Sequence, residues 1–266
     1  MKNPPKLVVF SDLDGTLLDH ETYLWKPAES ALRRLAALRV PVVLTSSKTA
    51  CEMKVLQDDM GLGDWPAIVE NGAGVIGLSD VHPPEIYSDL RKALDRLPAR
   101  LRQSFQGFGD LTVEEISTLT GLPNADAQRA KARRYSEPGL WSGTDKTLAE
   151  FTSALARESL MAQQGGRFLT VSFGRTKADA MDTVIKTLRA EITLALGDAP
   201  NDFAMLEKAD LGVIVANPHR AVPPLLSGEK DGRIMRTQAL GPAGWNHAVH
   251  GILDELGFAE GRTLNG

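Results

Sequence analysis

Continuous apolar runs alternate with amphipathic segments near both ends of the chain. Each run is short and rich in valine, leucine or isoleucine, as in a parallel strand that is covered on both faces. The intervening segments carry apolar residues at helical spacing, for example Leu32, Leu35 and Leu38. The runs are residues 7–10, 42–44, 68–69, 192–196 and 211–215. Strands that alternate with helices in this order predict an α/β fold with a Rossmann-like, doubly wound parallel sheet.

The pattern changes to mixed helix and strand signals in the middle of the chain. Thr112 and Glu115 have the spacing of a capping box at the start of a helix. The other predicted elements are a helix from Asn124 to about Arg134, a helix from Thr144 or Asp145 to Gly165-Gly166, and a half-buried strand over residues 167–173. We therefore predict a discontinuous catalytic core of residues 1–82 and 175–266, with an inserted α+β cap domain of residues 83–174.

Composition and charge narrow the class of protein. A hydrophobic fraction of 42% and a charged fraction of 24% over 266 residues are ordinary for a globular enzyme. The net charge of -4 does not favour a nucleic-acid partner, and no apolar stretch approaches 18 residues. The single cysteine, Cys51, excludes an internal disulfide and fits a reducing compartment. We expect a cytoplasmic protein with a small-molecule partner, without a nucleic-acid or membrane partner; the oligomeric state stays open.

Two carboxylate clusters follow two of the predicted strands. Asp12 and Asp14 come directly after residues 7–10, and Asp198 and Asp202 come directly after residues 192–196. Open α/β sheets bind their ligands at the carboxyl ends of the strands, so these clusters are expected to meet. Their carboxylates would repel one another without a cation, and oxygen ligands favour Mg²⁺. The pattern predicts a magnesium site for phosphate chemistry, with Asp198 as the best ligand of the second cluster.

The residue types at the strand ends suit hydrolysis of a phosphate ester. Asp12 can attack phosphorus as a carboxylate nucleophile, and Asp14 can protonate the leaving oxygen and later deprotonate water. Ser46 can donate its hydroxyl to a phosphate oxygen, and Thr45 is the competing assignment. Lys177 could balance the charge of Asp12 and of bound phosphate.

Two further strand-end residues could lie on the same face. Lys48 follows the second predicted strand and could contact substrate, whereas Asn71 follows the third strand and could contact substrate or only shape its turn.

The motifs assembled above resemble those of the haloacid dehalogenase (HAD) superfamily. They are D-L-D-G-T at 12–16, Ser46, Lys177 and G-D-A-P-N-D at 197–202. An insert after the third strand resembles the large α/β cap subclass (IIB), which includes sugar-phosphate phosphatases and phosphomannomutases. Several segments also resemble the mannosyl-3-phosphoglycerate phosphatase family. They are residues 45–49, 69–73, 107–112, 114–116, 119–122 and 134–138.

The resemblance implies a role for each matching residue. Asp12 would be the nucleophile and Asp14 the general acid and base. Mg²⁺ would be held by Asp12, the backbone carbonyl of Asp14 and Asp198. In the sequence itself, Asn201 and Asp202 follow Asp198 as the next candidate ligands of the second cluster. The implied reaction releases phosphate from 2-O-mannosyl-3-phosphoglycerate and yields mannosylglycerate, a compatible solute.

That substrate carries a glycerate carboxylate, which needs a cationic reader. Arginine suits a carboxylate because its planar fork can bind both oxygens. Arg134 and Arg167 are the favoured candidates in the insert, because one adjoins the 135–137 segment and the other begins the predicted strand.

Three alternatives stay open at this point. The substrate could be glucosyl-3-phosphoglycerate or another sugar phosphate. A phosphohexomutase would use the same Asp12 and Asp14 but return the phosphoryl group to a sugar. A non-catalytic sugar-phosphate sensor would have no need for both carboxylates.

Overall fold

The chain forms two compact units. A computed structural model describes residues 6–78 and 86–258. Unit 1 comprises Met1–Ser46, Gln57–Ile68 and Lys177–Gly266, and unit 2 comprises Ser47–Leu56 and Val69–Thr176. The predicted boundary between residues 82 and 83 lies outside the described residues, so the division into core and cap domains stays a prediction. Within the described ranges, no helix is both long and apolar enough to cross a membrane.

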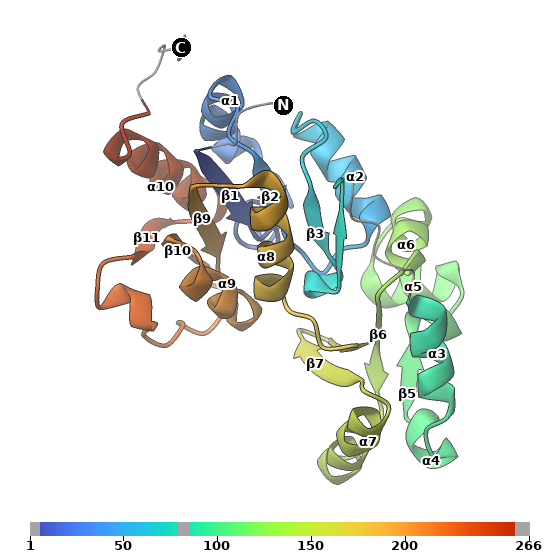
Figure 1. The fold of residues 1–266 in the computed structure, drawn as a ribbon. Coiled ribbons are helices and arrows are strands. Elements are labelled where there is room, and N and C mark those ends of the chain that lie inside the picture. Colours follow the sequence, from blue (N-terminus) through green and yellow to red (C-terminus); the bar gives the residue numbers. More distant parts are fainter. Residues whose placement is uncertain (1–5, 79–85, 259–266) are drawn as a thin grey trace. The chain divides into compact units, whose positions relative to one another are not determined.

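Unit 1 is built on a five-stranded parallel sheet. The strand order is β11-β10-β9-β1-β2 (Figure 1). The strands are β1 (Leu7–Ser11), β2 (Val42–Leu44), β9 (Ile192–Gly197), β10 (Leu211–Ala216) and β11 (Ile234–Leu240). All residues of β1 are buried, as expected for a continuous apolar run between two layers of helices. The predicted parallel α/β sheet is confirmed.

Helices pack against this sheet and bury its side chains. They are α1 (Glu29–Ala37), α8 (Lys177–Leu188), α9 (Phe203–Lys208) and α10 (Gly241–Glu255). α1 contacts α10 and α8 contacts α9, and α8 passes in front of the sheet in Figure 1. Trp245 of α10 is fully buried, and its Nε1 donates to Ser11 Oγ at 2.9 Å. This hydrogen bond ties α10 to the carboxyl end of β1.

The carboxyl end of β2 joins a short third strand. β3 (Ala67–Val69) pairs with β4 (Gly74–Ile76), and Thr45 forms a parallel bridge with Ile68. The helix α2 (Ala50–Asp59) connects β2 with β3. The turn after β3 runs through Glu70 and Asn71, which have φ values of 51° and 59°. This left-handed backbone reverses the chain toward β4.

Unit 2 contains a four-stranded antiparallel sheet in the order β5-β6-β8-β7. Its strands are β5 (Phe105–Gly107), β6 (Ser136–Trp141), β7 (Met161–Gly165) and β8 (Phe168–Ser172). Its helices are α3 (Tyr87–Asp95), α4 (Ala99–Arg102), α5 (Val113–Thr120), α6 (Asn124–Lys131) and α7 (Asp145–Arg157). Leu90, Phe105, Phe151 and Val171 belong to the cluster that α3, α4 and α7 form with the sheet.

Two sequence predictions in unit 2 were wrong in detail. The helix expected to reach Gly165-Gly166 ends at Arg157, because Ser159 adopts a left-handed φ of 58° and the chain then forms β7. The helix expected to reach Arg134 ends at Lys131, and Pro123 rather than Asn124 is its N-cap residue. The capping box was predicted correctly: Thr112 Oγ1 accepts from Glu115 N, and Glu115 Oε2 accepts from Thr112 N.

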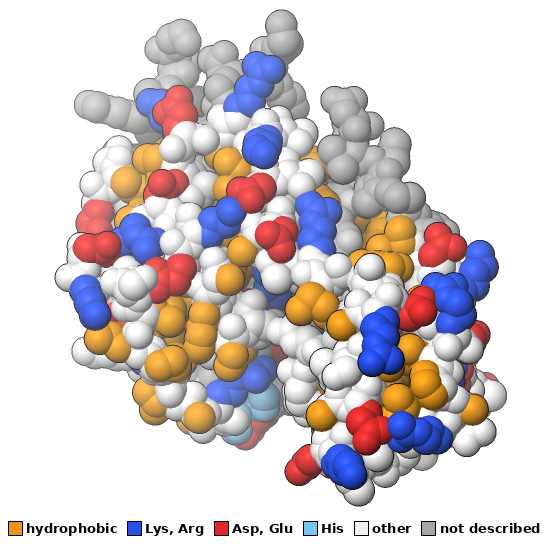
Figure 2. Space-filling view, turned by 60° about the horizontal axis from the view of Figure 1, so that its bottom comes forward, with side chains coloured by type: hydrophobic (Ala, Val, Ile, Leu, Met, Phe, Trp, Pro, Cys, Tyr) orange, Lys and Arg blue, Asp and Glu red, His pale blue; other side chains and the backbone are white. Residues whose placement is uncertain are grey.

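Charged side chains of both signs are interspersed on the face shown in Figure 2. Among the described side chains on this face, no broad patch carries a single sign of charge.

Candidate active site

The carboxyl ends of β1 and β9 bring the two acidic clusters together. These strands are neighbours in register, with Ser11 opposite Leu196, so Asp12 and Asp198 follow at the same sheet edge. The backbone N–H of Asp12 donates to Leu196 O at 2.9 Å, which continues the strand pairing to the first carboxylate. The predicted meeting of the two loops is thus present in unit 1.

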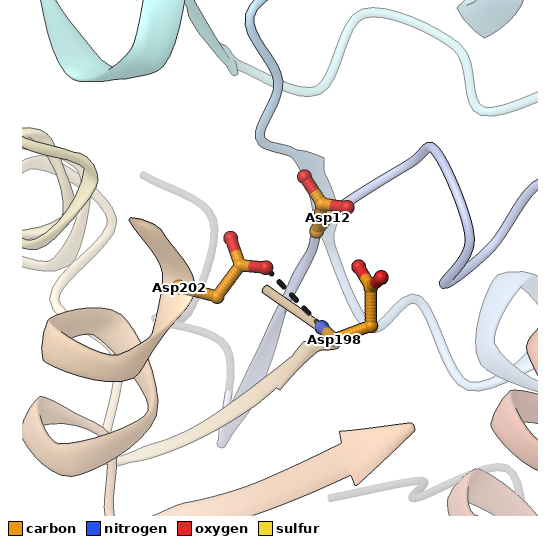
Figure 3. A group of neighbouring side chains, drawn as sticks. All are labelled: Asp12, Asp198 and Asp202. Atoms are coloured by element: carbon orange, nitrogen blue, oxygen red, sulfur yellow. Dashed lines mark hydrogen bonds between the residues drawn. The ribbon is translucent and has the colours of Figure 1, made fainter. Parts of the chain in front are cut away.

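Three buried carboxylates form the centre of the site. One oxygen each of Asp12, Asp198 and Asp202 lies within 4.8 Å of the others. In Figure 3, Asp12 and Asp198 lie at the ends of their strands, and Asp202 extends toward them from a helical turn. Asp202 also holds its own loop, because its Oδ2 accepts from the backbone N–H groups of Asp198 at 3.2 Å and Ala199 at 3.0 Å. Gly197 permits this approach, since a Cβ there would lie 2.5 Å from Asp202 Cβ.

Lys177 bridges two of these carboxylates. Its Nζ lies 2.6 Å from Asp12 Oδ1 and 2.7 Å from Asp202 Oδ1, and it donates to Thr45 O at 3.3 Å. The side chain is 1% exposed. Burial alone would lower the pKa of Lys177, but the charges of Asp12 and Asp202 outweigh it and raise that pKa. Lys177 is therefore a fixed positive charge beside Asp12, where the sequence predicted it.

Asp198 has partners that the sequence reasoning missed. Its Oδ1 accepts from Thr16 Oγ1 at 3.0 Å, whereas its Oδ2 accepts from Asn217 Nδ2 at 2.7 Å and pairs with Arg220 Nε at 2.8 Å. Asn217 directly follows β10, the neighbour of β9. The sequence carried one signal for this contact: Asn217 directly follows a predicted strand, and this position places its amide side chain at the same sheet edge.

The loop after β1 makes a close approach to these groups. Gly15 has a φ of 91°, and a Cβ at this position would lie 2.3 Å from Asn217 Nδ2 and 2.9 Å from Asp198 Oδ2. Only glycine fits both the left-handed backbone and the available space. The glycine of the D-L-D-G-T motif therefore allows the loop to close over Asp198.

The electrostatics of the site suit a divalent cation. Burial raises the pKa of Asp12 most, Asp202 raises it further, and Lys177 opposes the change. Burial likewise raises the pKa of Asp198, against the hydrogen bond from Asn217.

If the three carboxylates are ionised, the positive charges of Lys177 and Arg220 leave one negative charge in excess. A hard cation with oxygen ligands, such as Mg²⁺, fits this donor set. Within this donor set, Asp12 and Asp198 are the predicted metal ligands, and Asp202 is a third carboxylate close to both.

The remaining predicted core residues lie at the end of β2, in the loop after β1 and beside Asp202 in the sequence. Thr45 and Ser46 are buried at the end of β2, and Ser46 N donates to Ile68 O at 3.0 Å. Asp14 lies in the loop after β1 and forms a bridge with Leu18. Asn201 lies beside Asp202 in a short 3-10 helix. Their chemical roles stay predictions.

Four predicted substrate residues belong to unit 2. Asn71 lies in the left-handed turn after β3, and Lys48 O accepts the backbone N–H of Glu70 at 3.0 Å. Arg134 is exposed, and its backbone N–H donates to Glu70 Oε1 at 2.9 Å. Arg167 is also exposed, although its Nη1 donates to Leu119 O at 3.0 Å and its guanidinium lies over the Phe168 ring. Contact of these residues with a substrate stays a prediction.

Comparison with known proteins gives the family and the fold. A model of haloacid dehalogenase-like hydrolases matches residues 9–95 and 142–225, well over half of the chain. The sucrose-phosphatase of Synechocystis sp. PCC6803 is 17% identical, with a TM-score of 0.59 over 93% of this chain and 98% of its own. BT1666 from Bacteroides thetaiotaomicron, a HAD-superfamily phosphatase, is 20% identical, with a TM-score of 0.65 over 96% of each chain.

A third similar structure is the HAD subclass IIB sugar phosphatase BT4131. It is 16% identical, with a TM-score of 0.62 over 95% of this chain and 99% of its own. At these identities the three structures establish a shared fold, whereas the family model establishes membership. The chain belongs to the haloacid dehalogenase-like hydrolase family.

Proposed function

We propose that the protein is a Mg²⁺-dependent phosphatase that releases phosphate from 2-O-mannosyl-3-phosphoglycerate. The observation that carries the proposal is the buried Asp12 carboxylate, which lies 2.6 Å from Lys177 Nζ and within reach of Asp198 and Asp202. Two similar structures are described as a sucrose-phosphatase and a sugar phosphatase, which supports a sugar phosphate as substrate. The motifs at 107–112 and 134–138 support the mannosyl-phosphoglycerate in particular.

Asp12 acts as the nucleophile in the proposed reaction. Its carboxylate attacks phosphorus, the P–O bond to the sugar-bearing fragment breaks, and an aspartyl-phosphate forms. Asp14 gives a proton to the leaving oxygen and then takes one from the water that hydrolyses the aspartyl-phosphate. Lys177 balances negative charge at Asp12, and Thr45 or Ser46 donates a hydroxyl hydrogen bond to phosphate. Mg²⁺, when bound by Asp12 and Asp198 with the Asp14 backbone carbonyl, would offset the charge of the phosphoryl oxygens.

The insert of residues 83–174 selects the substrate in this proposal, and residues 1–82 and 175–266 carry the chemistry. Arg134 or Arg167 binds the glycerate carboxylate, and both side chains are exposed. Lys48 and Asn71 are further substrate contacts of the proposed site.

A phosphate-release assay tests this proposal. The chain would be incubated with Mg²⁺ and, in parallel, with 2-O-mannosyl-3-phosphoglycerate, its glucosyl analogue, sucrose 6-phosphate and mannose 6-phosphate. We expect the highest kcat/KM for the mannosyl compound and no release by Asp12→Asn. A higher kcat/KM for another substrate would remove the mannosyl assignment and leave the phosphatase assignment.

Failure to release phosphate from any substrate would contradict phosphatase activity. Conversion of mannose 1-phosphate into mannose 6-phosphate without free phosphate would instead identify a phosphohexomutase. Tight binding of a sugar phosphate without any turnover would identify a sensor.

A further inference from the structure

The turn after β10 places a second cation against the proposed metal site. Arg220 N donates to Asn217 O at 3.4 Å, and His219 N donates to Asn217 Oδ1 at 3.0 Å. The turn thereby presents Asn217 Nδ2 and Arg220 Nε to the same oxygen, Oδ2 of Asp198. One carboxylate oxygen thus accepts a hydrogen bond from Asn217 and forms an ion pair with Arg220, both from a single turn.

The Asp198 carboxylate already has polar partners on both of its oxygens. A carboxylate offers about four lone-pair sites, two on each oxygen. Asn217 and Thr16 take one site each through hydrogen bonds, to Oδ2 at 2.7 Å and to Oδ1 at 3.0 Å, and Arg220 forms an ion pair with Oδ2 at 2.8 Å. The Asp198 side chain is 0% exposed, so bulk water does not add further donors. A divalent cation at Asp198 would therefore compete with Arg220 for the charge of this carboxylate.

Arg220 is the partner of Asp198 best suited to be replaced by a cation. Its side chain is 38% exposed, whereas the carboxylate that it pairs with is fully buried. Within residues 6–78 and 86–258 the structure gives Nη1 and Nη2 of Arg220 no acceptor. These two amines form the part of the guanidinium fork that can bind an anion with two parallel hydrogen bonds. A divalent ion at Asp198 would also repel the guanidinium, because like charges a few ångströms apart interact strongly in a buried site.

We propose that Arg220 is an exchangeable cation of this site. It neutralises Asp198 until a divalent cation takes that charge, and its guanidinium then binds the anionic phosphate group of the ligand. The first half concerns only Asp198 and the divalent cation. The second half rests on the proposed phosphatase function.

Calorimetric titration of the full chain with MgCl₂, without substrate, tests the first half. We expect Arg220→Gln to lower the Kd for Mg²⁺ by about tenfold, because the competing charge is removed. Arg220→Lys keeps the charge, so its Kd should stay near that of the unaltered protein. Asn217→Ala is the matched control, since it removes the neutral donor from the same oxygen and should not tighten binding. An unchanged or higher Kd for Mg²⁺ in Arg220→Gln overturns the proposal. An equal fall of this Kd in Asn217→Ala overturns it as well.

Titration with inorganic phosphate at saturating Mg²⁺ tests the second half. Arg220→Gln should raise the Kd for phosphate by about tenfold through the loss of a charge-assisted bidentate contact. An unchanged Kd overturns this half. Thermal unfolding of each variant checks the fold, and Arg220→Ala repeats both titrations if the glutamine variant unfolds. Absence of phosphate binding and of phosphate release in the unaltered protein would count against the proposed function, while the Mg²⁺ titration would still judge the first half.

Discussion

Lys177 is the residue on which the charge balance of the buried site depends. It contacts Asp12 and Asp202, and all three side chains lie in the interior of unit 1. Burial acts to lower the pKa of Lys177, but the two carboxylates outweigh burial and raise it. A lysine whose pKa is higher in the folded state stabilises that state fully below the unfolded value of 10.5, and this stabilisation is lost as the pH rises through the folded pKa.

Lys177→Met should therefore destabilise the protein at neutral pH. Methionine fills a similar volume but leaves Asp12 and Asp202 buried without their cation, which costs ~3–5 kcal/mol of unfolding free energy. The difference from the unaltered protein should shrink below neutral pH, because the variant can protonate its buried carboxylates, and above pH 10.5, where the lysine contribution falls. Urea unfolding at several pH values without Mg²⁺ measures this. Equal stability at pH 7 would contradict the charge balance described above.

Asp12→Asn should abolish turnover while the protein stays folded. The amide has nearly the same shape but lacks the anionic oxygen that attacks phosphorus, so kcat should fall by ~10³-fold or more. Phosphate release and circular dichroism measure the two properties. Asp19→Asn is a suitable control, because Asp19 is a half-buried aspartate later in the same loop. Substantial activity of Asp12→Asn would remove the aspartyl-phosphate mechanism.

At the scale of elements, the segment Gly107–Asp110 has a structural role in unit 2. The backbone N–H of Gly109 donates to Glu137 Oε1 at 2.9 Å, and Tyr87 Oη and Arg91 Nη1 donate to Glu137 Oε2 at 2.5 Å and 3.0 Å. Glu137 is fully buried on β6. The motif that resembles a phosphatase family therefore joins α3, β5 and β6.

Asp110 extends this network to two arginines. Burial alone would raise the pKa of Asp110, but hydrogen bonds from Arg102 and Arg91 outweigh it and lower the pKa to about 2. A carboxyl whose pKa is lowered on folding stabilises the protein above its unfolded value of 3.8, and this contribution is lost as the pH falls toward 2. Asp110 is only partly buried, so solvent screening reduces its effect on stability.

The pairing of β5 with β6 should tolerate no side chain at Gly139. Gly139 lies opposite Gly107, and a Cβ there would be 2.6 Å from the backbone oxygen of Gln106 and 2.8 Å from Gly107 Cα. Gly139→Ala should therefore separate the strands and lower the unfolding free energy by ~1–3 kcal/mol. Gly165→Ala on β7 of the same sheet is the matched control, because nothing lies within 4 Å of its Cβ. Equal unfolding free energies of the two variants in urea would count against the close contact between β5 and β6.

At the scale of the whole molecule, the chain divides into two units with different chemistry. The buried acidic cluster lies entirely in unit 1, whereas the buried Glu137 network lies entirely in unit 2. Each unit has its own packed interior. Ligands of the acidic cluster should consequently stabilise one unit more than the other.

Mg²⁺ should protect unit 1 selectively in hydrogen exchange. Binding to the folded state alone adds about 2.7 kcal/mol at roughly a hundred times Kd. Slower exchange is expected in β1, β9 and β10 after Mg²⁺ addition, reversal is expected with a chelator, and little change is expected in β5 to β8. Asp198→Asn should weaken this response, because it removes a carboxylate ligand. Equal protection of both units, or an unaltered response of Asp198→Asn, would disagree with a metal site at the acidic cluster.

The sequence by itself determined the parallel α/β fold and the local setting of Asp12, Asp198 and Lys177. Apolar runs, helix starts and acidic turns are local signals, so they show where a strand ends and which side chain follows it. Adjacent parallel strands then place Asp12 and Asp198 together, as expected. The chemical roles of these residues stay predictions.

Only the tertiary structure decided which distant groups complete the cluster. Asn217 and Arg220 reach Asp198 because β10 lies beside β9, and strand order depends on non-local packing. The same limit explains β7, which was predicted as helix. Met161–Gly165 carries a weak local pattern, and its extended form is stabilised by hydrogen bonds to β8 that exist only after the chain has folded back.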